Sequence, residues 1–195
     1  MTGLGTVAWP PAPIDTDRLV LRASAARDRA AFVELFASPE VGTYIGGARP
    51  REELERAVPE VPGNRAGTFV VAREGAMIGM VTLDRRGTER RGRVRAEGDE
   101  VELGYLFLPA AWGHGYAHEA AAAALGWCAA ALPGEPVVLT TQSVNDRAVR
   151  LAARLGFTEV ERFEEYGAEQ WFGVWAPAAP GTAGAPGATA APDQR

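Results

Sequence analysis

The chain has 195 residues, of which 47% are hydrophobic and 23% charged, with a formal net charge of −5. These values are typical of a globular protein with one sizeable core, and a negative net charge gives no general attraction toward nucleic acid. All 20 basic residues are arginine, so the lysine of a P-loop is absent and nucleotide hydrolysis of that type is excluded.

The first half of the chain predicts a sheet with two helices. Residues 1–14 contain three prolines and predict a loose N-terminal arm before a domain spanning residues 15–176. The elements predicted here are, in chain order, a strand at 19–22, helices at 27–36 and 51–58, and strands at 68–72 and 77–83. Arg73-Glu-Gly-Ala separates the last two strands and is typical of a hairpin turn.

The second half begins with a clear alternation at 100–108. One face of this strand carries Val101, Leu103, Tyr105 and Phe107, and the other carries Glu102, Gly104, Leu106 and Leu108. The elements that follow are a helix from 116 to about 132, a strand at 137–142, a helix at 145–155, and strands at 157–163 and 170–175. Because strands and helices are mixed without strict alternation, we expect an α+β fold with a mixed, mainly antiparallel sheet flanked by helices.

The composition also limits the environment and the partners of the protein. Residues 177–195 are almost entirely Ala, Pro, Gly and Thr and predict a disordered tail. The longest apolar run, Ala120 to Leu132, is too short to span a bilayer. The only cysteine, Cys128, excludes an internal disulfide and favours a reducing compartment. We expect a soluble cytoplasmic protein, monomeric or homodimeric, with no membrane partner and no nucleic acid.

The most informative segment is Trp112-Gly-His-Gly-Tyr-Ala117, which lies between a predicted strand and a predicted helix. The first turn of a helix has N–H groups without acceptors and a partial positive charge, and glycines let an anion approach the backbone. The segment therefore indicates a bound phosphate. A dinucleotide fingerprint needs a third glycine where this chain has His118, so that interpretation is weak.

The same segment resembles the acetyl-CoA diphosphate loop of the GNAT superfamily of acetyltransferases, and Trp112 is similar to the branch that acetylates the N-termini of ribosomal proteins. Two further segments match in the same order. Asp17-Arg-Leu-Val-Leu-Arg22 resembles the opening strand of that branch, and residues 145–157 resemble the superfamily helix that ends in Leu-Gly-Phe. The matches run from about residue 16 to residue 175.

The resemblance implies a sheet splayed between the fourth and fifth predicted strands, 100–108 and 137–142, with the pantetheine arm of acetyl-CoA in the gap. The backbone N–H of Phe107 would then point at the thioester carbonyl. The residues implied to bind acetyl-CoA are Leu106, Phe107, Leu108, Trp112, Gly113, His114, Gly115, Tyr116, Ala117 and Asn145. A simple helix cap remains an alternative interpretation of Asn145.

The implied reaction is direct attack of a primary amine on acetyl-CoA, which requires a base. An α-amine costs only about 1 kcal/mol to neutralise at pH 7, so a base acting through water suffices. Glu102 is the candidate base, with Glu100 and Asp84 as weaker alternatives, although Glu102 could also be a solvated strand residue. Tyr44 is the candidate wall of the acceptor site.

Some features leave the function open. Ala152 stands where many superfamily members have a tyrosine that protonates the leaving thiolate, and Ala148 replaces the serine of the ribosomal branch. A non-catalytic acetyl-CoA-binding module, regulatory or ribosome-associated, is therefore the alternative to an N-acetyltransferase.

His114 and His118 have metal-ligand spacing but no third ligand, so no metal is expected. The segment Arg85–Arg95 holds six arginines and predicts a solvated hairpin that could bind an acidic or RNA-associated substrate.

Overall fold

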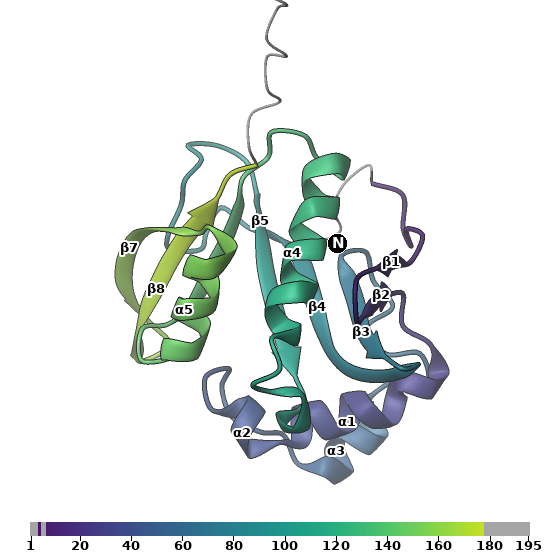
Figure 1. Ribbon diagram of the computed structural model, residues 1–195. Helices are drawn as coiled ribbons and strands as arrows, with labels where there is room; N and C mark the ends of the chain where they lie inside the picture. Colours follow the sequence, from purple (N-terminus) through teal and green to yellow (C-terminus); the bar gives the residue numbers. More distant parts are fainter. Residues whose placement is uncertain (1–3, 5–6, 178–195) are drawn as a thin grey trace, which may run out of the picture.

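A single mixed sheet organises the chain in the computed structural model, which describes residues 4 and 7–177 (Figure 1). Its strands are β1 (Ile14–Asp15), β2 (Val20–Arg22), β3 (Thr68–Arg73), β4 (Ala76–Arg86), β5 (Glu100–Phe107), β6 (Val137–Gln142), β7 (Thr158–Glu165) and β8 (Ala168–Trp175). They lie in the order β1-β2-β3-β4-β5-β6-β8-β7. Among the described residues only the pair β5–β6 is parallel. The expected α+β class and mainly antiparallel sheet are confirmed.

Helices cover both faces of this sheet. They are α1 (Arg29–Ala37), α2 (Pro39–Gly42), α3 (Arg51–Ala57), α4 (Tyr116–Ala131) and α5 (Asp146–Leu155). Figure 1 shows α4 and α5 in front of the sheet and α1, α2 and α3 gathered at its lower end. The short α2 was not predicted from the sequence. Its start is fixed by Ser38, whose side chain accepts a hydrogen bond from the Val41 N–H, and by proline at the first helical position.

The alternation predicted for β5 sorts its side chains into two cores. Val101, Leu103 and Phe107 belong to the larger core, which includes the buried alanines of α4. Leu106 and Leu108 pack instead against the smaller core, which contains Phe32 and Leu35 of α1. Since neighbouring strand residues point to opposite faces, one strand contributes to both layers. The alternation is confirmed, and it places Glu102 on the face opposite α4.

The expected splay is also present, between β5 and β6. These strands pair only at Val101–Val137 and Glu102–Val138, whereas β5 and β4 pair over the whole length of β5. The Leu108 N–H donates to the Ile78 carbonyl on the β4 side, at 3.0 Å. Because N–H directions alternate along an antiparallel ladder, the backbone N–H and C=O of Phe107 face away from β4 and into the gap.

The N-terminal segment differs from the expected loose arm where the structure describes it. Leu4 is 1% exposed and belongs to the larger core. Trp9 packs edge-on against Phe69 and Trp127, with ring centroids 4.9 Å and 6.0 Å apart. Large apolar side chains therefore hold this segment against the sheet and α4 despite its prolines. The predicted disordered tail lies outside the described residues, apart from residue 177.

Candidate functional site

The loop Trp112–Gly115, called the glycine loop below, joins the end of β5 to the start of α4. Gly113 has φ = 79° and Gly115, the N-cap of α4, has φ = 80°. Residues with a Cβ rarely adopt this left-handed conformation, so the turn depends on glycine. A Cβ on Gly113 would have no atom within 4 Å, and one on Gly115 would meet only an Arg18 guanidinium nitrogen at 3.5 Å. The protein leaves the surface above this loop open.

The start of α4 presents backbone donors at this open surface. The Glu119 N–H donates to the Gly115 carbonyl at 3.2 Å. The N–H groups of Tyr116, Ala117 and His118 come before this first helical bond and have no acceptor within the helix. The helix is 16 residues long, so the partial charge of its dipole adds to these donors. This arrangement favours an anion such as a diphosphate.

Arg18 and Glu119 hold the glycine loop from the side. The Glu119 carboxylate accepts from the Thr16 hydroxyl at 2.6 Å, the Arg18 N–H at 2.9 Å and the Arg18 Nε at 2.7 Å. Arg18 also donates to the His114 carbonyl at 3.0 Å. Burial alone would raise the pKa of Glu119, but the hydrogen bonds from Thr16 and Arg18 outweigh it and leave this pKa below its ordinary value.

The side chains of the glycine loop and the helix start are also ordered. The rings of His114 and Tyr116 stack at 5.4 Å, and the Arg18 guanidinium lies 4.8 Å from the centre of the Tyr116 ring. The Trp112 indole N–H donates to the Phe107 carbonyl at 2.8 Å. Trp112 therefore ties the glycine loop to the end of β5.

Within the described part of the chain, no three His, Cys, Asp or Glu side chains are placed to share a metal ion.

Asn145 lies beyond β6, on the other side of the gap. Its Oδ1 caps α5 by accepting from the Ala148 N–H at 3.2 Å, so the helix-cap interpretation is realised. Its Nδ2 has only a long contact of 3.4 Å with the Thr141 hydroxyl. The amide can therefore keep its cap bond and still donate to a ligand in the gap.

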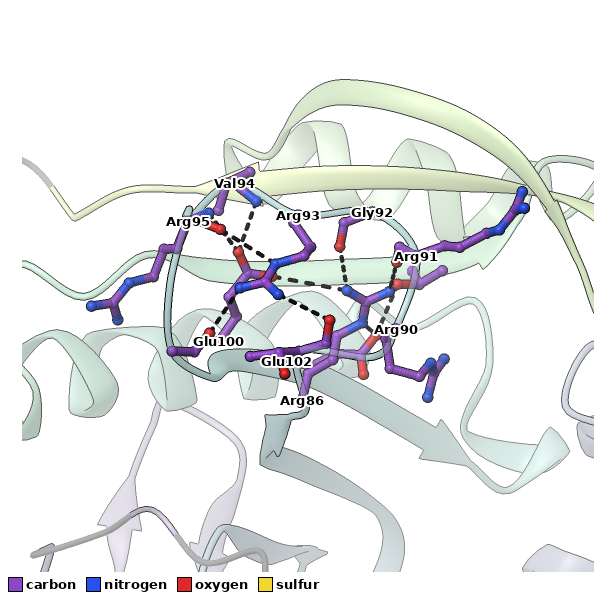
Figure 2. A network of polar contacts seen from close by, with 12 residues as sticks. Arg86, Arg90, Arg91, Gly92, Arg93, Val94, Arg95, Glu100 and Glu102 are labelled. Atoms are coloured by element: carbon purple, nitrogen blue, oxygen red, sulfur yellow. Dashed lines mark hydrogen bonds and ion pairs between the residues drawn. The ribbon is translucent and has the colours of Figure 1, made fainter.

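Glu102 is held by two strands on the face opposite α4 (Figure 2). Its Oε1 accepts from the Thr140 hydroxyl of β6 at 2.8 Å, and the Arg86 Nε of β4 lies 3.5 Å from the same oxygen. The Glu102 side chain is 23% exposed, whereas that of Arg86 is 1% exposed. Burial lowers the pKa of Arg86, the nearby Glu102 carboxylate raises it, and the lowering prevails. An arginine shifted in this way still carries its charge at neutral pH.

The two alternative bases are occupied by other contacts. Asp84 is bound by both guanidinium nitrogens of Arg65. Glu100 is 2% exposed and accepts from the N–H groups of Val94 and Arg95, each at 2.7 Å. Both carboxylates therefore serve the local structure, whereas Oε2 of Glu102 has no hydrogen bond among the described residues.

The segment Arg85–Arg95, called the arginine segment below, is not the solvated hairpin that the sequence predicts. Arg85 and Arg86 extend β4, and Arg86 donates to the carbonyls of Gly92 and Arg91 from within the structure. Arg85 and Arg95 both contact the Glu135 carboxylate. The sequence indicates a solvated charged segment here, but the structure buries Arg86 and half-buries Arg85, while Arg91 and Arg95 stay exposed.

A cleft of about 590 Å³ opens beside Glu102 on this face. It is lined by Arg65, Asp84, Arg85, Arg86, Gly87, Glu89, Arg90, Asp99 and Glu102. Four arginines and four acidic residues therefore share the lining, and the cleft has no net charge. Water and a polar acceptor can reach Glu102 from this side.

Tyr44 lies farther along the same face. Its carbonyl accepts from the Gln142 side chain at 3.4 Å, and Tyr44 is 39% exposed. Gln142 and Thr140 are two residues apart on β6 and so point to one face. The loop after α2 thus reaches the end of β6 on the side where Glu102 lies.

The fold and the glycine loop are those of a known family of enzymes. The acetyltransferase (GNAT) domain model matches residues 18–158, which include the glycine loop, Glu102 and Asn145. The chain belongs to the GNAT acetyltransferase family.

Individual relatives of this GNAT acetyltransferase agree with that assignment. The uncharacterized protein YkkB of Bacillus subtilis is 28% identical over 148 residues, which cover 72% of this chain and 82% of YkkB. A GNAT-family acetyltransferase of Bacillus anthracis has a TM-score of 0.68 at 22% identity, over 84% of this chain and 98% of its own. The ribosomal L7/L12 α-N-protein acetyltransferase RimL, solved with coenzyme A, has a TM-score of 0.66 at 16% identity, over 84% and 97%.

Family membership makes the protein an acetyl-CoA-dependent acetyltransferase, and its own residues fit that co-substrate. The N–H donors at the start of α4, which have no acceptor within the helix, suit the diphosphate. The unpaired edge of β5 suits the amide-rich pantetheine, because an extended ligand can replace the missing strand partner. No helix among the described residues has the length and apolar character to cross a membrane.

Proposed function

We propose that this GNAT acetyltransferase transfers the acetyl group of acetyl-CoA to a primary amine by direct attack. A single observation supports this most strongly: β5 and β6 pair only at Val101–Val137 and Glu102–Val138, which leaves the β5 edge without a strand partner from beyond Glu102 toward the glycine loop. If the diphosphate of acetyl-CoA lies at the glycine loop and the pantetheine follows β5, the thioester lies in the gap beside Phe107. An acceptor entering from the opposite face would meet it there.

The N–H of Phe107 is the proposed oxyanion donor. The register of β4 and β5 turns this N–H into the gap, and the Trp112 indole on the Phe107 carbonyl fixes the same peptide unit. A fixed donor of this kind commonly contributes about 3 kcal/mol to the transition state of acyl transfer. It supplies this without a reactive side chain, which suits a site built mainly from backbone.

The proposed acceptor is an amine of low pKa. A lysine-type amine costs about 4–5 kcal/mol to neutralise at pH 7, whereas an α-amine costs about 1 kcal/mol. Glu102 and Phe107 are five residues apart, or about 17 Å along an extended strand. Glu102 therefore receives the proton through water in the cleft rather than by direct contact. Such an arrangement suits an α-amine, and the fold shared with RimL, an α-N-protein acetyltransferase, supports the same choice.

A transfer screen tests the proposal. The purified protein is incubated with acetyl-CoA and a panel of amino acids, polyamines, amine antibiotics and N-terminal peptides, and release of free thiol is recorded together with the mass of each acceptor. We expect acetylation of an α-amine, with lysine-type amines slower at pH 7. Matched peptides with a free and with a blocked N-terminus, each containing one lysine, identify which amine reacts.

Ala152 favours a second candidate function in the same screen. It is fully buried and has no hydroxyl with which to protonate a leaving thiolate. Binding of acetyl-CoA without any acetylated product would support the non-catalytic, acetyl-CoA-binding module and would contradict the proposed reaction.

A further inference from the structure

We propose that Arg86 and Thr140 are positioning residues that fix one oxygen of Glu102 and leave its other oxygen as the proton acceptor. This inference rests on the proposed function, because it assigns a role to the proposed base. Arg86 comes from β4 and lies beside Glu102 (Figure 2), and Thr140 comes from β6, so the strands on both sides of β5 hold one carboxylate. Both contacts are to Oε1. Among the described residues, no hydrogen bond to Oε2 is found.

The strand geometry explains why these residues meet. Glu102 pairs with Asp84 across the β4–β5 ladder, and Arg86 lies two residues farther along β4 on the same face. Residues placed diagonally across a ladder are within reach of a long side chain. On the β6 side, Glu102 is one of the two β5 residues that still pair before the strands separate. Thr140 thus lies just beyond the last pair, at the mouth of the gap.

The contacts of Arg86 indicate a function beyond holding the loop. Its two terminal nitrogens donate to carbonyls of the arginine segment. Its Nε is buried and has no hydrogen-bond partner by strict geometry, while the nearest carboxylate oxygen is Oε1 of Glu102 at 3.5 Å. An unpaired buried donor is costly. The one group placed to compensate it is the ionised carboxylate, so this arginine favours the form of Glu102 that accepts a proton.

Other charges near Glu102 are largely balanced among themselves. Asp84 is bound by Arg65, and Glu100 by two backbone N–H groups. The remaining charged residues that line the cleft are Arg85, Glu89, Arg90 and Asp99. Arg85 pairs with Glu135, and Arg90 lies 3.5 Å from Glu165. Arg86 is therefore the cation in contact with Glu102.

Thr140 gives the cleanest test, because valine has the same shape and suits a strand. With the amine identified by the screen, Thr140→Val should lower kcat/KM about 10- to 100-fold, with an unchanged acetyl-CoA dissociation constant in calorimetry. Thr140→Ser, which keeps the hydroxyl, should restore most of the rate. In a Glu102→Gln background the Thr140→Val change should have no further effect, since it acts through the missing carboxylate.

Arg86 is tested without any acceptor. The side-chain carboxyl of Glu102 is followed by ¹³C NMR from pH 3 to pH 8 and is assigned by its loss in Glu102→Gln. Removing a neighbouring cation disfavours the ionised carboxylate, so the Glu102 resonance of Arg86→Gln should change at a higher pH than that of the parent protein. Arg86→Lys, which keeps the charge, should stay close to the parent protein. If Arg86→Gln does not fold, the proposal is tested by the titration of Arg86→Lys and by the comparison of Thr140→Val in the parent and Glu102→Gln proteins.

The outcomes separate this inference from the proposed function. The positioning role alone is overturned if Thr140→Val lowers kcat/KM equally in the parent and in the Glu102→Gln protein. It is also overturned if the Glu102 titration is unchanged in a folded Arg86→Gln protein. A Glu102→Gln protein with the full parental rate overturns the base itself. If the screen yields no acceptor, the NMR titration still decides whether Arg86 acts on Glu102.

Discussion

The glycine loop and the arginine segment look alike in the sequence, since each is a polar, glycine-containing connection next to β5, but they work in opposite ways. The glycine loop turns backbone N–H groups outward, and its glycines keep the surface above it open. The arginine segment turns charge inward, where Arg86 and Glu100 hold its carbonyls and N–H groups. The proposed anion site thus lies at a loop without an arginine, whereas Arg85, Arg86 and Arg93 of the arginine segment contact a carboxylate or carbonyls of the protein itself.

The largest effect expected from this comparison is on stability, at Arg86. Arg86→Met removes the cation that lies 3.9 Å from the Glu100 carboxylate and 3.5 Å from that of Glu102, and loss of one partner from a buried cluster of this kind typically costs about 3–5 kcal/mol. Arg91→Met is the matched control, because no side-chain contact of Arg91 is found among the described residues and it is exposed; its effect should be within about 0.5 kcal/mol. Chemical denaturation measures both. Equal losses would show that the arginine segment is held by net charge and not by Arg86.

The next effect is on the cofactor, at Gly115. Gly115→Asp places a carboxylate where a diphosphate would lie, and acetyl-CoA affinity should fall about 100-fold, or ~2.7 kcal/mol. The left-handed φ of Gly115 strains any residue with a Cβ, but Asp tolerates this conformation better than most and its Cβ would meet only Arg18, so the variant should fold with reduced stability. Gly134→Asp is the matched control, since Gly134 has φ = 78° and open space around it. Unchanged calorimetric affinity in a folded Gly115→Asp protein would make the glycine loop a structural turn only.

A smaller effect separates the two roles of Asn145. Asn145→Asp keeps a good helix cap but loses the amide donor, so stability should hold while acetyl-CoA binds about 10-fold more weakly. Asn145→Ala loses both functions and should also destabilise the protein by about 1 kcal/mol. Calorimetry and denaturation on the two variants decide the question. Full acetyl-CoA affinity in Asn145→Asp leaves the residue as a helix cap.

The smallest effect concerns Glu119, which supports the glycine loop. Because its pKa is lowered in the folded protein, its contribution is complete above the ordinary value of 4.5 and is lost as the pH falls through the lowered pKa. Glu119→Gln should therefore cost about 1 kcal/mol at pH 7, and the difference from the parent should shrink toward pH 3. Thermal unfolding across pH 3–7 measures it. A difference that persists unchanged in acid would mean that shape rather than charge holds this contact.

Local patterns made much of the fold and the glycine loop predictable. The alternation along β5 anticipated which residues face each core, and Gly113 and Gly115 identified the turn where a left-handed backbone is required. These properties depend on neighbours in the sequence. The splay between β5 and β6 came from the family resemblance instead, since spacing alone does not reveal where two strands part.

The features that the sequence did not predict depend on contacts between residues far apart in the chain. Thr140 lies 38 positions from Glu102, and nothing in its own neighbourhood marks it as a ligand of that carboxylate. Arg86 looked like one of six solvated arginines, although β4 carries it into the interior. Leu4 and Trp9 lie in a proline-containing arm, and only α4 and the sheet together create the space that they fill. Burial of this kind is a property of the assembled layers and not of the local sequence.

The central claim is that Glu102 accepts the proton of the amine, and the pH–rate profile of Glu102→Gln tests it most directly. On the amine identified by the screen, kcat/KM should fall about 10²- to 10⁴-fold near neutral pH, with acetyl-CoA affinity unchanged. The loss should shrink toward pH 9, because more of the amine is then already neutral. A parental rate from pH 6 to 9 would contradict the claim, and so would a uniform loss accompanied by weaker acetyl-CoA binding.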